Sequence, residues 1–276
     1  MTVAVAAAVA DGVLPGRVWI YSNYHCNLAC SYCLTDSAPG VAKRALTADR
    51  MVRVAEQAAE LGFDAIGVTG GEPFLAPGMA GTLARIADIL PTIALTNGTL
   101  FSGARLAALD ALAGRDIALQ ISLDAADPDV NDEARGAENF AQVIDAIPKL
   151  VERGIRVRLA TTVGDVAPHD AARLCALHRE LGVADEDHVV RPIVHRGRAA
   201  ERAIGVHATR DDLPAELTVT ADGAYWSPFG PTVRDGRVDT DLLISRTTDP
   251  LAVPAELLLR AVEGRPPGTD TTLNIR

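Results

Sequence analysis

Short apolar segments alternate with segments of helical periodicity between residues 17 and 195, and this alternation constrains the fold most. The strand-like segments are residues 17–21, 64–69, 92–95, 116–123, 155–163 and 188–194. The helix-like segments are residues 45–61, 79–90, 102–113, 139–153 and 170–181. Such a repeat predicts parallel strands joined by crossover helices. Six units are too few for a closed eight-stranded barrel, so we expect an open, partial (β/α)6 barrel of the α/β class.

Polar and glycine-rich residues gather at the ends of these predicted strands. Parallel strands share one carboxyl edge, and ligands of such folds bind there. Five of the six strands carry such residues at that edge, which is stronger evidence than any single motif. The runs are the loop of residues 22–34, Gly70-Gly71-Glu72-Pro73, Thr96-Asn97-Gly98, Ser122-Leu123-Asp124 and Arg191-Pro192.

The pattern changes after about residue 200, where a smaller unit is expected. Residues 216–226 read as a hairpin, because the pair Asp222-Gly223 is a strong turn signal. A last helix is expected over residues 254–262, followed by a tail that starts at Pro266-Pro267. The predicted organisation is an N-terminal extension, a core and a C-terminal α+β appendage, at residues 1–16, 17–205 and 206–276. Within the extension, residues 3–10 are expected to be frayed or peripheral.

Three of the four cysteines, Cys26, Cys30 and Cys33, fall within eight residues. Three thiolates on one loop can hold three irons of a cubane iron–sulfur cluster and leave the fourth iron without a protein ligand. Zinc is the rival, but a structural zinc site uses four ligands, usually as two separated pairs. No second pair is present, and the remaining Cys175 lies in a helical pattern where a small core residue is expected.

Composition and charge argue against several classes of function. The formal net charge is −10 and no basic stripe is present, which disfavours a protein that holds nucleic acid through its phosphates. No apolar run is long enough to span a bilayer, and no hydrophobic signal peptide opens the chain. Because iron-bound thiolates and a free Cys175 suit a reducing compartment, we expect a cytoplasmic protein.

These residues resemble a known family, the radical S-adenosylmethionine (SAM) enzymes. The resemblance rests on the Cys-x3-Cys-x2-Cys run of residues 26–33, with Tyr32 before its last cysteine, and on Gly-Gly-Glu-Pro at residues 70–73. It covers residues 17–195, the length of the family's partial barrel. It implies that the three cysteines ligate one 4Fe–4S cluster and that SAM binds the open iron. Reductive cleavage of SAM would then give a 5′-deoxyadenosyl radical that takes a hydrogen atom from a substrate.

The resemblance also implies which residues contact SAM. Tyr32 would lie against the adenine, and Glu72 would accept a hydrogen bond from the ammonium group. Ser122 and Asp124 would contact the ribose and the carboxylate, and Arg191 could pair with the carboxylate. The predicted cofactor-binding residues are Tyr32, Gly70, Gly71, Glu72, Pro73, Thr96, Asn97, Ser122, Asp124 and Arg191. Plain structural roles stay open for several, such as turn chemistry at Thr96-Asn97.

Two further runs resemble parts of the family. Arg135-Gly136 is similar to the Arg-Gly of peptide-modifying and molybdenum-cofactor members. Gly197-Arg198-Ala199 is similar to a run in the subfamily that carries a C-terminal cluster-binding extension called SPASM. No cysteine follows Cys175, however, so thiolates there cannot bind auxiliary clusters and the appendage resembles a degenerate cap. The histidines outside the cysteine loop share no spacing and are predicted to be structural or on the surface.

Two classes of function follow from these residues. The first is a radical enzyme that receives electrons from an external reductant of the flavodoxin or ferredoxin kind and acts on a peptide or a small metabolite. The 16 residues before the first strand are too few for a leader-binding domain, which weakens the peptide option. The second is an iron–sulfur electron-transfer or scaffold protein without turnover. The Gly-Gly-Glu-Pro turn argues against it, because an electron carrier needs no cofactor-binding turn beside its cluster.

Overall fold

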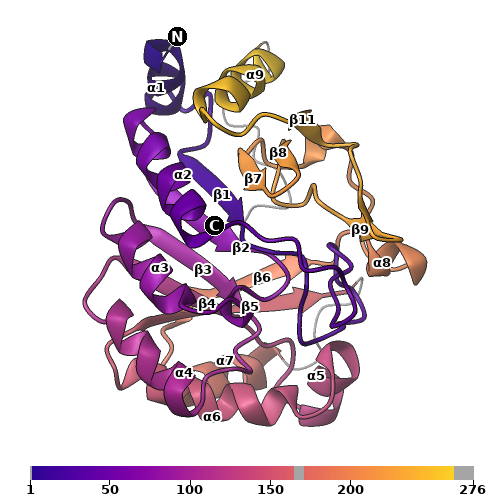
Figure 1. Ribbon diagram of the computed structural model, residues 1–276. Helices are drawn as coiled ribbons and strands as arrows, with labels where there is room; N and C mark the ends of the chain where they lie inside the picture. Colours follow the sequence, from indigo (N-terminus) through magenta and orange to yellow (C-terminus); the bar gives the residue numbers. More distant parts are fainter. Residues whose placement is uncertain (1, 165–170, 264–276) are drawn as a thin grey trace.

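The core is a nine-stranded sheet in the order β11-β8-β7-β1-β2-β3-β4-β5-β6. Figure 1 shows the computed structural model, which describes residues 2–164 and 171–263. Strands β1 to β6 pair in sequence order, and every pair is parallel. Their bounds are β1 (Arg17–Tyr21), β2 (Ala65–Thr69), β3 (Thr92–Thr96), β4 (Ile117–Ser122), β5 (Arg156–Val163) and β6 (His188–Pro192). Because β6 ends the sheet and β7 takes the free edge of β1, the predicted open barrel is confirmed.

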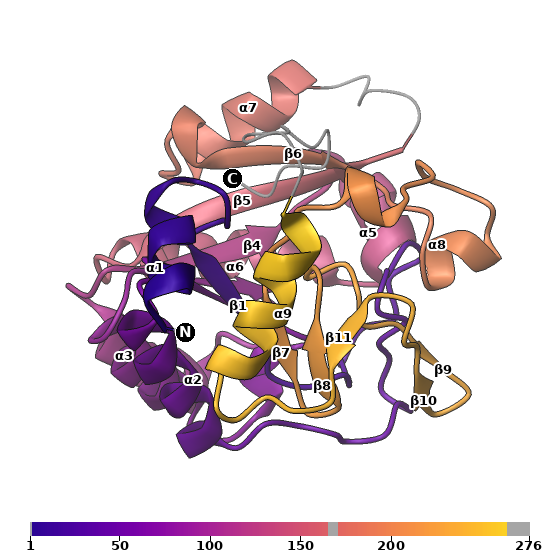
Figure 2. The ribbon, with the colours of Figure 1, turned by 90° about the horizontal axis from the view of Figure 1, so that it is seen from above.

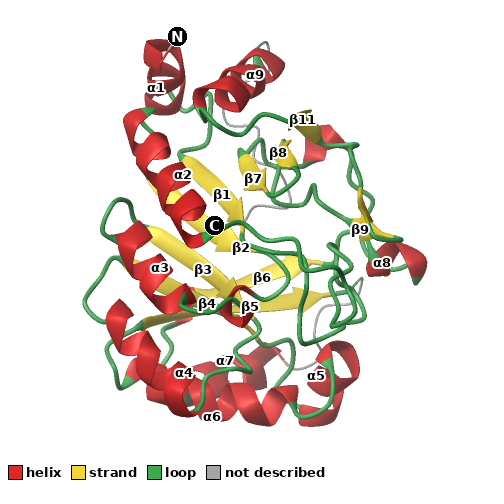
Figure 3. Cartoon of the chain, viewed as in Figure 1, coloured by secondary structure: helices red, strands yellow, loops and turns green. Residues whose placement is uncertain are grey.

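Helices follow most of the parallel strands and lie along one side of the sheet (Figures 1 and 3). They are α2 (Ala48–Glu60), α3 (Met79–Ala87), α4 (Gly103–Ala108), α6 (Asn139–Val151) and α7 (Ala171–Glu180). The helix predicted over residues 102–113 breaks after α4 into a 3-10 turn at Leu109–Leu112. Residue 170, the predicted start of α7, lies outside the described residues. Cys175 was wrongly expected in the core, because on α7 it is partly exposed.

The sequence reading missed α5 (Pro128–Arg135). Asp127 caps it, since its carboxylate accepts hydrogen bonds from the backbone N–H groups of Asp129 and Val130. Pro128 then occupies the first turn, where a residue without an N–H costs nothing. An Asp-Pro start was therefore the available signal. Thr47 caps α2, because its side chain accepts from the Arg50 N–H at 3.2 Å.

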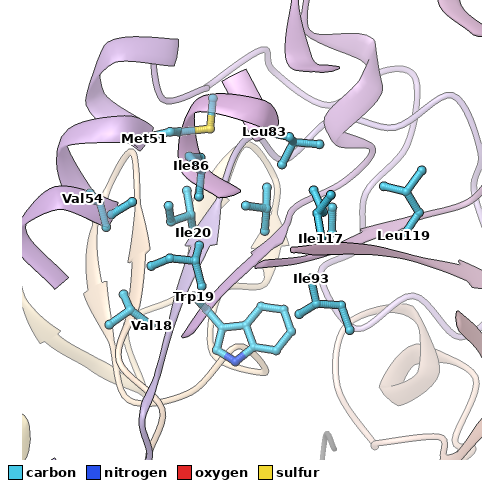
Figure 4. Close-up of a cluster of buried hydrophobic side chains, with 14 of the residues drawn as sticks. Val18, Trp19, Ile20, Met51, Val54, Leu83, Ile86, Ile93, Ile117 and Leu119 are labelled. Atoms are coloured by element: carbon cyan, nitrogen blue, oxygen red, sulfur yellow. The ribbon is translucent and has the colours of Figure 1, made fainter. Parts of the chain in front are cut away.

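Alternation along β1 divides its side chains between two faces (Figure 4). Val18 and Ile20 belong to the buried apolar cluster that Met51 of α2 and the helix α3 complete. Trp19 points the other way, into the concave side of the sheet, and its indole N–H donates to Glu216 at 2.6 Å. The concave side is therefore lined by side chains that alternate with those of the helix-covered core.

The C-terminal residues extend the same sheet. The predicted hairpin is confirmed as antiparallel β7 (Thr218–Thr220) and β8 (Gly223–Tyr225), with β11 (Leu243–Ser245) beside β8. Strand β7 runs parallel to β1, so the two stretches meet along one backbone ladder. Short elements complete this part: α8 (Arg198–Glu201), β9 (Val233–Arg234) and β10 (Arg237–Val238). The boundary between core and appendage stays a prediction.

Residues 2–10 are helical, so the expectation of a frayed segment was wrong, whereas a peripheral position is not contradicted. Helix α1 (Thr2–Ala10) contacts α9 (Ala252–Val262), and the two lie side by side in Figures 1 and 2. Val5 is fully buried, which explains why this Ala- and Val-rich segment is ordered. The predicted tail from Pro266 lies outside the described residues. Among the described helices, none is both long enough and apolar enough to cross a bilayer.

Gly67 on β2 allows the Trp19 indole to lie directly on the sheet, and this contact yields a stability prediction. A Cβ at residue 67 would come within 2.3 Å of Cε3 of Trp19, whose ring is buried and held by Glu216. We expect Gly67→Ala to lower the free energy of unfolding by about 1–3 kcal/mol, measured by chemical denaturation.

The matched control is Gly81→Ala in the exposed part of α3, where an added Cβ meets no atom within 4 Å. Alanine favours the helix there, so this variant should gain roughly 0.5–1 kcal/mol. An unchanged denaturation midpoint for Gly67→Ala would contradict the packing of Trp19 on β2.

Candidate functional site

A cavity of about 230 Å³ lies at the carboxyl ends of the parallel strands. Its lining combines the loop after β1 with residues from the ends of β2, β3, β4, β5 and β6. Most of the predicted site residues line it together. These are Cys26, Cys30, Cys33, Tyr32, Gly70, Gly71, Thr96, Asn97, Ser122 and Arg191. The sheet topology therefore gathers residues that are separated by up to 165 positions in the chain, as the strand-end pattern indicated.

The three cysteines are free thiols on the loop that follows β1. Cys26 is buried, and its Sγ accepts hydrogen bonds from the Leu28 N–H at 3.4 Å and the Asn97 side-chain amide at 3.6 Å. Cys30 and Cys33 are partly buried. Burial raises the pKa of Cys26 to about 12 and also raises that of Cys30. Both thiols are thus protonated in the metal-free protein, and binding a metal must displace their protons.

The arrangement of the thiols fits a cluster better than a single ion. Within the described ranges, no three His, Cys, Asp or Glu side chains converge closely enough to hold one metal ion. In a cubane cluster each thiolate binds a different iron, so three ligands must surround a volume rather than meet at a point. Three free thiols that line one cavity meet that requirement. Cys26, Cys30 and Cys33 therefore fit a 4Fe–4S cluster.

The Gly-Gly-Glu-Pro turn after β2 supports the cysteine loop through backbone contacts. The N–H groups of Gly71 and Glu72 donate to the carbonyls of Asn23 and His25, each at 3.0 Å. A Cβ on Gly71 would lie 2.1 Å from the His25 carbonyl oxygen, so only glycine permits this approach. The glycines line the cavity, as expected, and they also fix the loop that carries the thiols.

Glu72 and Pro73 lie behind the cavity wall, not on it. The Glu72 side chain is fully buried, and Oε1 accepts from the Phe74 N–H at 3.0 Å and the Thr96 hydroxyl at 2.9 Å. Its Oε2 accepts from the Asn97 N–H at 2.8 Å. Burial raises the pKa of this carboxyl to about 7. Glu72 thus ties the end of β2 to the end of β3, and its predicted contact with the SAM ammonium stays a prediction.

Tyr32, Asp124 and Arg135 form a buried polar cluster next to Cys30. The Tyr32 hydroxyl donates to Asp124 and accepts from Arg135, and Arg135 Nη1 pairs with Asp124 Oδ2 at 3.0 Å. Burial raises the pKa of Tyr32, so the hydroxyl keeps its proton. The second Asp124 oxygen accepts from the Thr162 N–H at 2.8 Å. Asp124 therefore lies outside the cavity lining and positions Tyr32 and Arg135, which line it.

The Gly197-Arg198-Ala199 run holds the cysteine loop from the outside. The Arg198 guanidinium donates to the carbonyls of Cys30 at 2.6 Å and Ser37 at 2.8 Å. The Arg198 N–H donates to the Cys33 carbonyl at 3.0 Å, and its side chain pairs with Asp36 at 2.8 Å. The residues after β6 therefore fix the backbone between the second and third cysteines.

Several lining residues were missed or underrated in the sequence. Trp19 faces the cavity because of its place in β1, and strand alternation could have shown this. Arg135 had the Arg-Gly signal but was not chosen as a site residue. Pro228 and Phe229 come from the loop after β8. No signal in their local sequence indicates that this loop reaches the cavity.

Comparisons with known proteins agree with this geometry. The family model of the Radical SAM superfamily matches residues 20–171. A GTP 3′,8-cyclase of Limosilactobacillus fermentum is 35% identical over 126 residues, which are 44% of this chain and 37% of the relative. A GTP 3′,8-cyclase of Pseudomonas fluorescens is 28% identical over 216 residues, 75% of this chain and 63% of the relative. The chain thus matches less than two thirds of either relative.

Solved structures share the fold. SuiB of Streptococcus suis bound to S-adenosylmethionine superposes with a TM-score of 0.58 at 20% identity, over 68% of this chain and 43% of that one. Native anSMEcpe with bound AdoMet gives a TM-score of 0.57 at 13% identity, over 80% and 76% of the two chains. Members of the family use a 4Fe–4S cluster and SAM. Since the family model covers more than half of the sequence, the chain belongs to the radical SAM superfamily.

Proposed function

We propose that this protein is a radical SAM enzyme with one 4Fe–4S cluster, held by Cys26, Cys30 and Cys33, that acts on a peptide or a small metabolite. The supporting observation is the single cavity that these thiols share with the glycines after β2 and the ends of β3 and β4. When bound, the cluster supplies the electron that cleaves SAM to methionine and a 5′-deoxyadenosyl radical, which takes a hydrogen atom from the substrate.

Hydrogen bonds from neighbouring residues adjust the charge on the Cys26 sulfur. The Leu28 N–H and the Asn97 amide both donate to Cys26 Sγ. Hydrogen bonds to cluster sulfurs stabilise negative charge and raise the reduction potential. Asn97 in turn is fixed, because its backbone N–H donates to Glu72 and its side-chain amide also donates to Oδ1 of the Asn27 side chain at 2.9 Å. Asn97 therefore links the end of β3 to the cysteine loop.

The lining offers a partner for each part of SAM. Gly70 and Gly71 let a ligand approach the backbone closely. Thr96, Asn97 and Ser122 add hydroxyl and amide groups at the strand ends, which suit the amino acid part and the ribose. The Tyr32 ring, held by Asp124 and Arg135, suits the adenine. Apolar residues complete the lining and exclude water: Trp19, Leu28, Leu95, Pro228 and Phe229.

The substrate classes follow from the relatives and the neighbours. The relatives are named GTP 3′,8-cyclases, so they act on a small molecule. SuiB has been solved with its precursor peptide SuiA, and anSMEcpe with the Cp18Cys peptide. We propose an external one-electron reductant of the flavodoxin or ferredoxin kind, because Cys175 is the only other cysteine of this chain. Cysteines that ligate a cluster must stay reduced, so we propose a cytoplasmic location.

The deciding experiment is anaerobic incubation of the reconstituted protein with SAM and dithionite. We expect 5′-deoxyadenosine and methionine, quantified by liquid chromatography and mass spectrometry. Cys30→Ala should lose the cluster absorption and the cleavage together, since a cubane with two protein ligands is poorly held. A wild-type protein that binds a cluster but forms no 5′-deoxyadenosine would favour the electron-carrier alternative.

Glu72→Gln tests the hydrogen bonds that connect the end of β2 to the end of β3. The amide NH2 of glutamine would face either the Asn97 N–H or the Phe74 N–H. Two donors would then oppose each other, and one buried N–H would lose its acceptor. We expect a loss of about 1–3 kcal/mol of stability and weaker SAM binding, measured by denaturation and by equilibrium titration. The iron content should persist, because the cluster ligands lie on another loop. Glu60→Gln on the exposed end of α2 is the control, and equal behaviour of the two variants would contradict the role of Glu72.

Arg198→Ala tests the outer support of the cysteine loop. It removes the two side-chain hydrogen bonds to the Cys30 and Ser37 carbonyls and the ion pair with Asp36. We expect less iron per chain after reconstitution and faster proteolysis within residues 26–37. Arg202→Ala, an exposed neighbour on the same turn, should leave both unchanged. Full iron content in Arg198→Ala would show that the loop does not depend on this contact.

A further inference from the structure

Positive side chains crowd the inside of the partial barrel below the strand ends. Arg17 on β1, Arg158 on β5 and Arg191 on β6 are close enough that the charges of the first two lower the pKa of Arg191, after burial, to about 10. Among the described residues, the carboxylates that face these arginines include Glu216 and Asp187. Asp187 lies 3.6 Å from Arg158 and also pairs with Arg156 on the rim at 2.7 Å.

Glu216 is already engaged by other groups. Its Oε2 accepts from the Trp19 indole at 2.6 Å, and its Oε1 lies 3.7 Å from Arg17 Nη1. It reaches Arg191 only through longer-range attraction. Glu216 is therefore the counter-ion of Arg17, and Arg191 has no carboxylate in direct contact within the part of the chain that the structure describes.

Arg191 has a weak set of partners for a recessed cation. Its Nη2 donates to the neutral Gln120 side chain at 3.3 Å, and its Nε is buried without a hydrogen-bond partner among the described residues. A buried cation without a charged or strongly hydrogen-bonded partner is costly. Arg191 is also one of the residues that line the cavity.

The level of Arg191 in the barrel separates it from the cysteine loop. Gln120 lies two residues before Ser122, the last residue of β4, which places it about 7 Å below the strand end. The guanidinium reaches down to Gln120, whereas the three thiols lie on the loop beyond the end of β1. Arg135 is the cation at the level of the thiols, and Asp124 pairs with it at 3.0 Å. Arg135 and Arg191 are the charged residues of the cavity lining other than the cysteines.

We propose that Arg191 binds an anionic oxygen group of the substrate, a carboxylate or a phosphate, at the inner end of the cavity. The proposal rests on the proposed function and assigns Arg191 to the substrate instead of the SAM carboxylate. Its planar fork of donors matches such groups in a bidentate way. Trp19 also lines the cavity and offers an apolar surface to the rest of the substrate. No carboxylate lines the cavity among the described residues, so nothing there repels an anion.

The test uses the cluster-reconstituted protein, saturated with SAM under anaerobic conditions, and two probes. Benzoate represents a carboxylate and inorganic phosphate represents a phosphate, and the affinity of each is measured by ligand-observed NMR titration. We expect saturable binding of at least one probe, and the preferred probe identifies the anion. Arg191→Gln should weaken that binding about tenfold or more, since a charge-assisted hydrogen-bond pair is lost. Arg191→Lys should retain part of it as a point charge.

The SAM affinity of the same variants is measured separately by equilibrium titration. An unchanged SAM affinity in Arg191→Gln, together with lost probe binding, supports the proposal. A lost SAM affinity would instead make Arg191 the partner of the cofactor carboxylate and overturn it. Arg105→Gln, an exposed arginine on α4, is the control for general charge effects.

Two other results would overturn the proposal: no saturable binding of either probe to the wild type, or equal binding to wild type and Arg191→Gln. Neither result depends on SAM cleavage. A wild type that fails to form 5′-deoxyadenosine but binds a probe through Arg191 would refute the proposed function and leave the anion site standing.

Discussion

The backbone contact between the cysteine loop and the turn after β2 is the constraint on which the site depends. Two main-chain hydrogen bonds join residues 71 and 72 to residues 23 and 25, and they form only because Gly71 has no side chain. Thiols on a free loop would have to be ordered as the cluster bound, at a cost in conformational entropy. The turn holds residues 23 and 25 and Arg198 holds residues 30 and 37, so the loop is ordered when the protein folds rather than when the cluster binds.

Glu72 is a motif residue with a clear structural role. Its carboxylate accepts three hydrogen bonds in a fully buried position and connects two strand ends. Asn97, one of its partners, donates to the sulfur of Cys26. A chain of contacts therefore runs from the end of β2 through the end of β3 to a cluster ligand. Such buried networks hold one geometry when every member is satisfied.

Local patterns predicted most of the barrel and the members of the site, but not their orientation. Strand β1 was predicted to the residue because its apolar run ends abruptly at the cysteine loop. The pairing of β7 with β1 was not foreseen, because contacts between residues 200 positions apart leave no periodic signal. Glu72 and Asp124 were placed at the right strand ends, yet neither is among the residues that line the cavity. Side-chain direction at a strand end depends on the hydrogen bonds available there, which a spacing pattern does not contain.

The charge distribution adds a constraint that the net charge of −10 conceals. The acidic side chains lie outside the cavity, while its lining holds two arginines at two depths. Arg135 is neutralised by Asp124 beside the thiols, whereas Arg191 donates to the neutral Gln120, so the positive charge at the inner end comes mainly from Arg191. In a recess with low-dielectric walls such a field is weakly screened and favours anions. The barrel therefore selects for negative charge at the end of the cavity farthest from the cysteine loop.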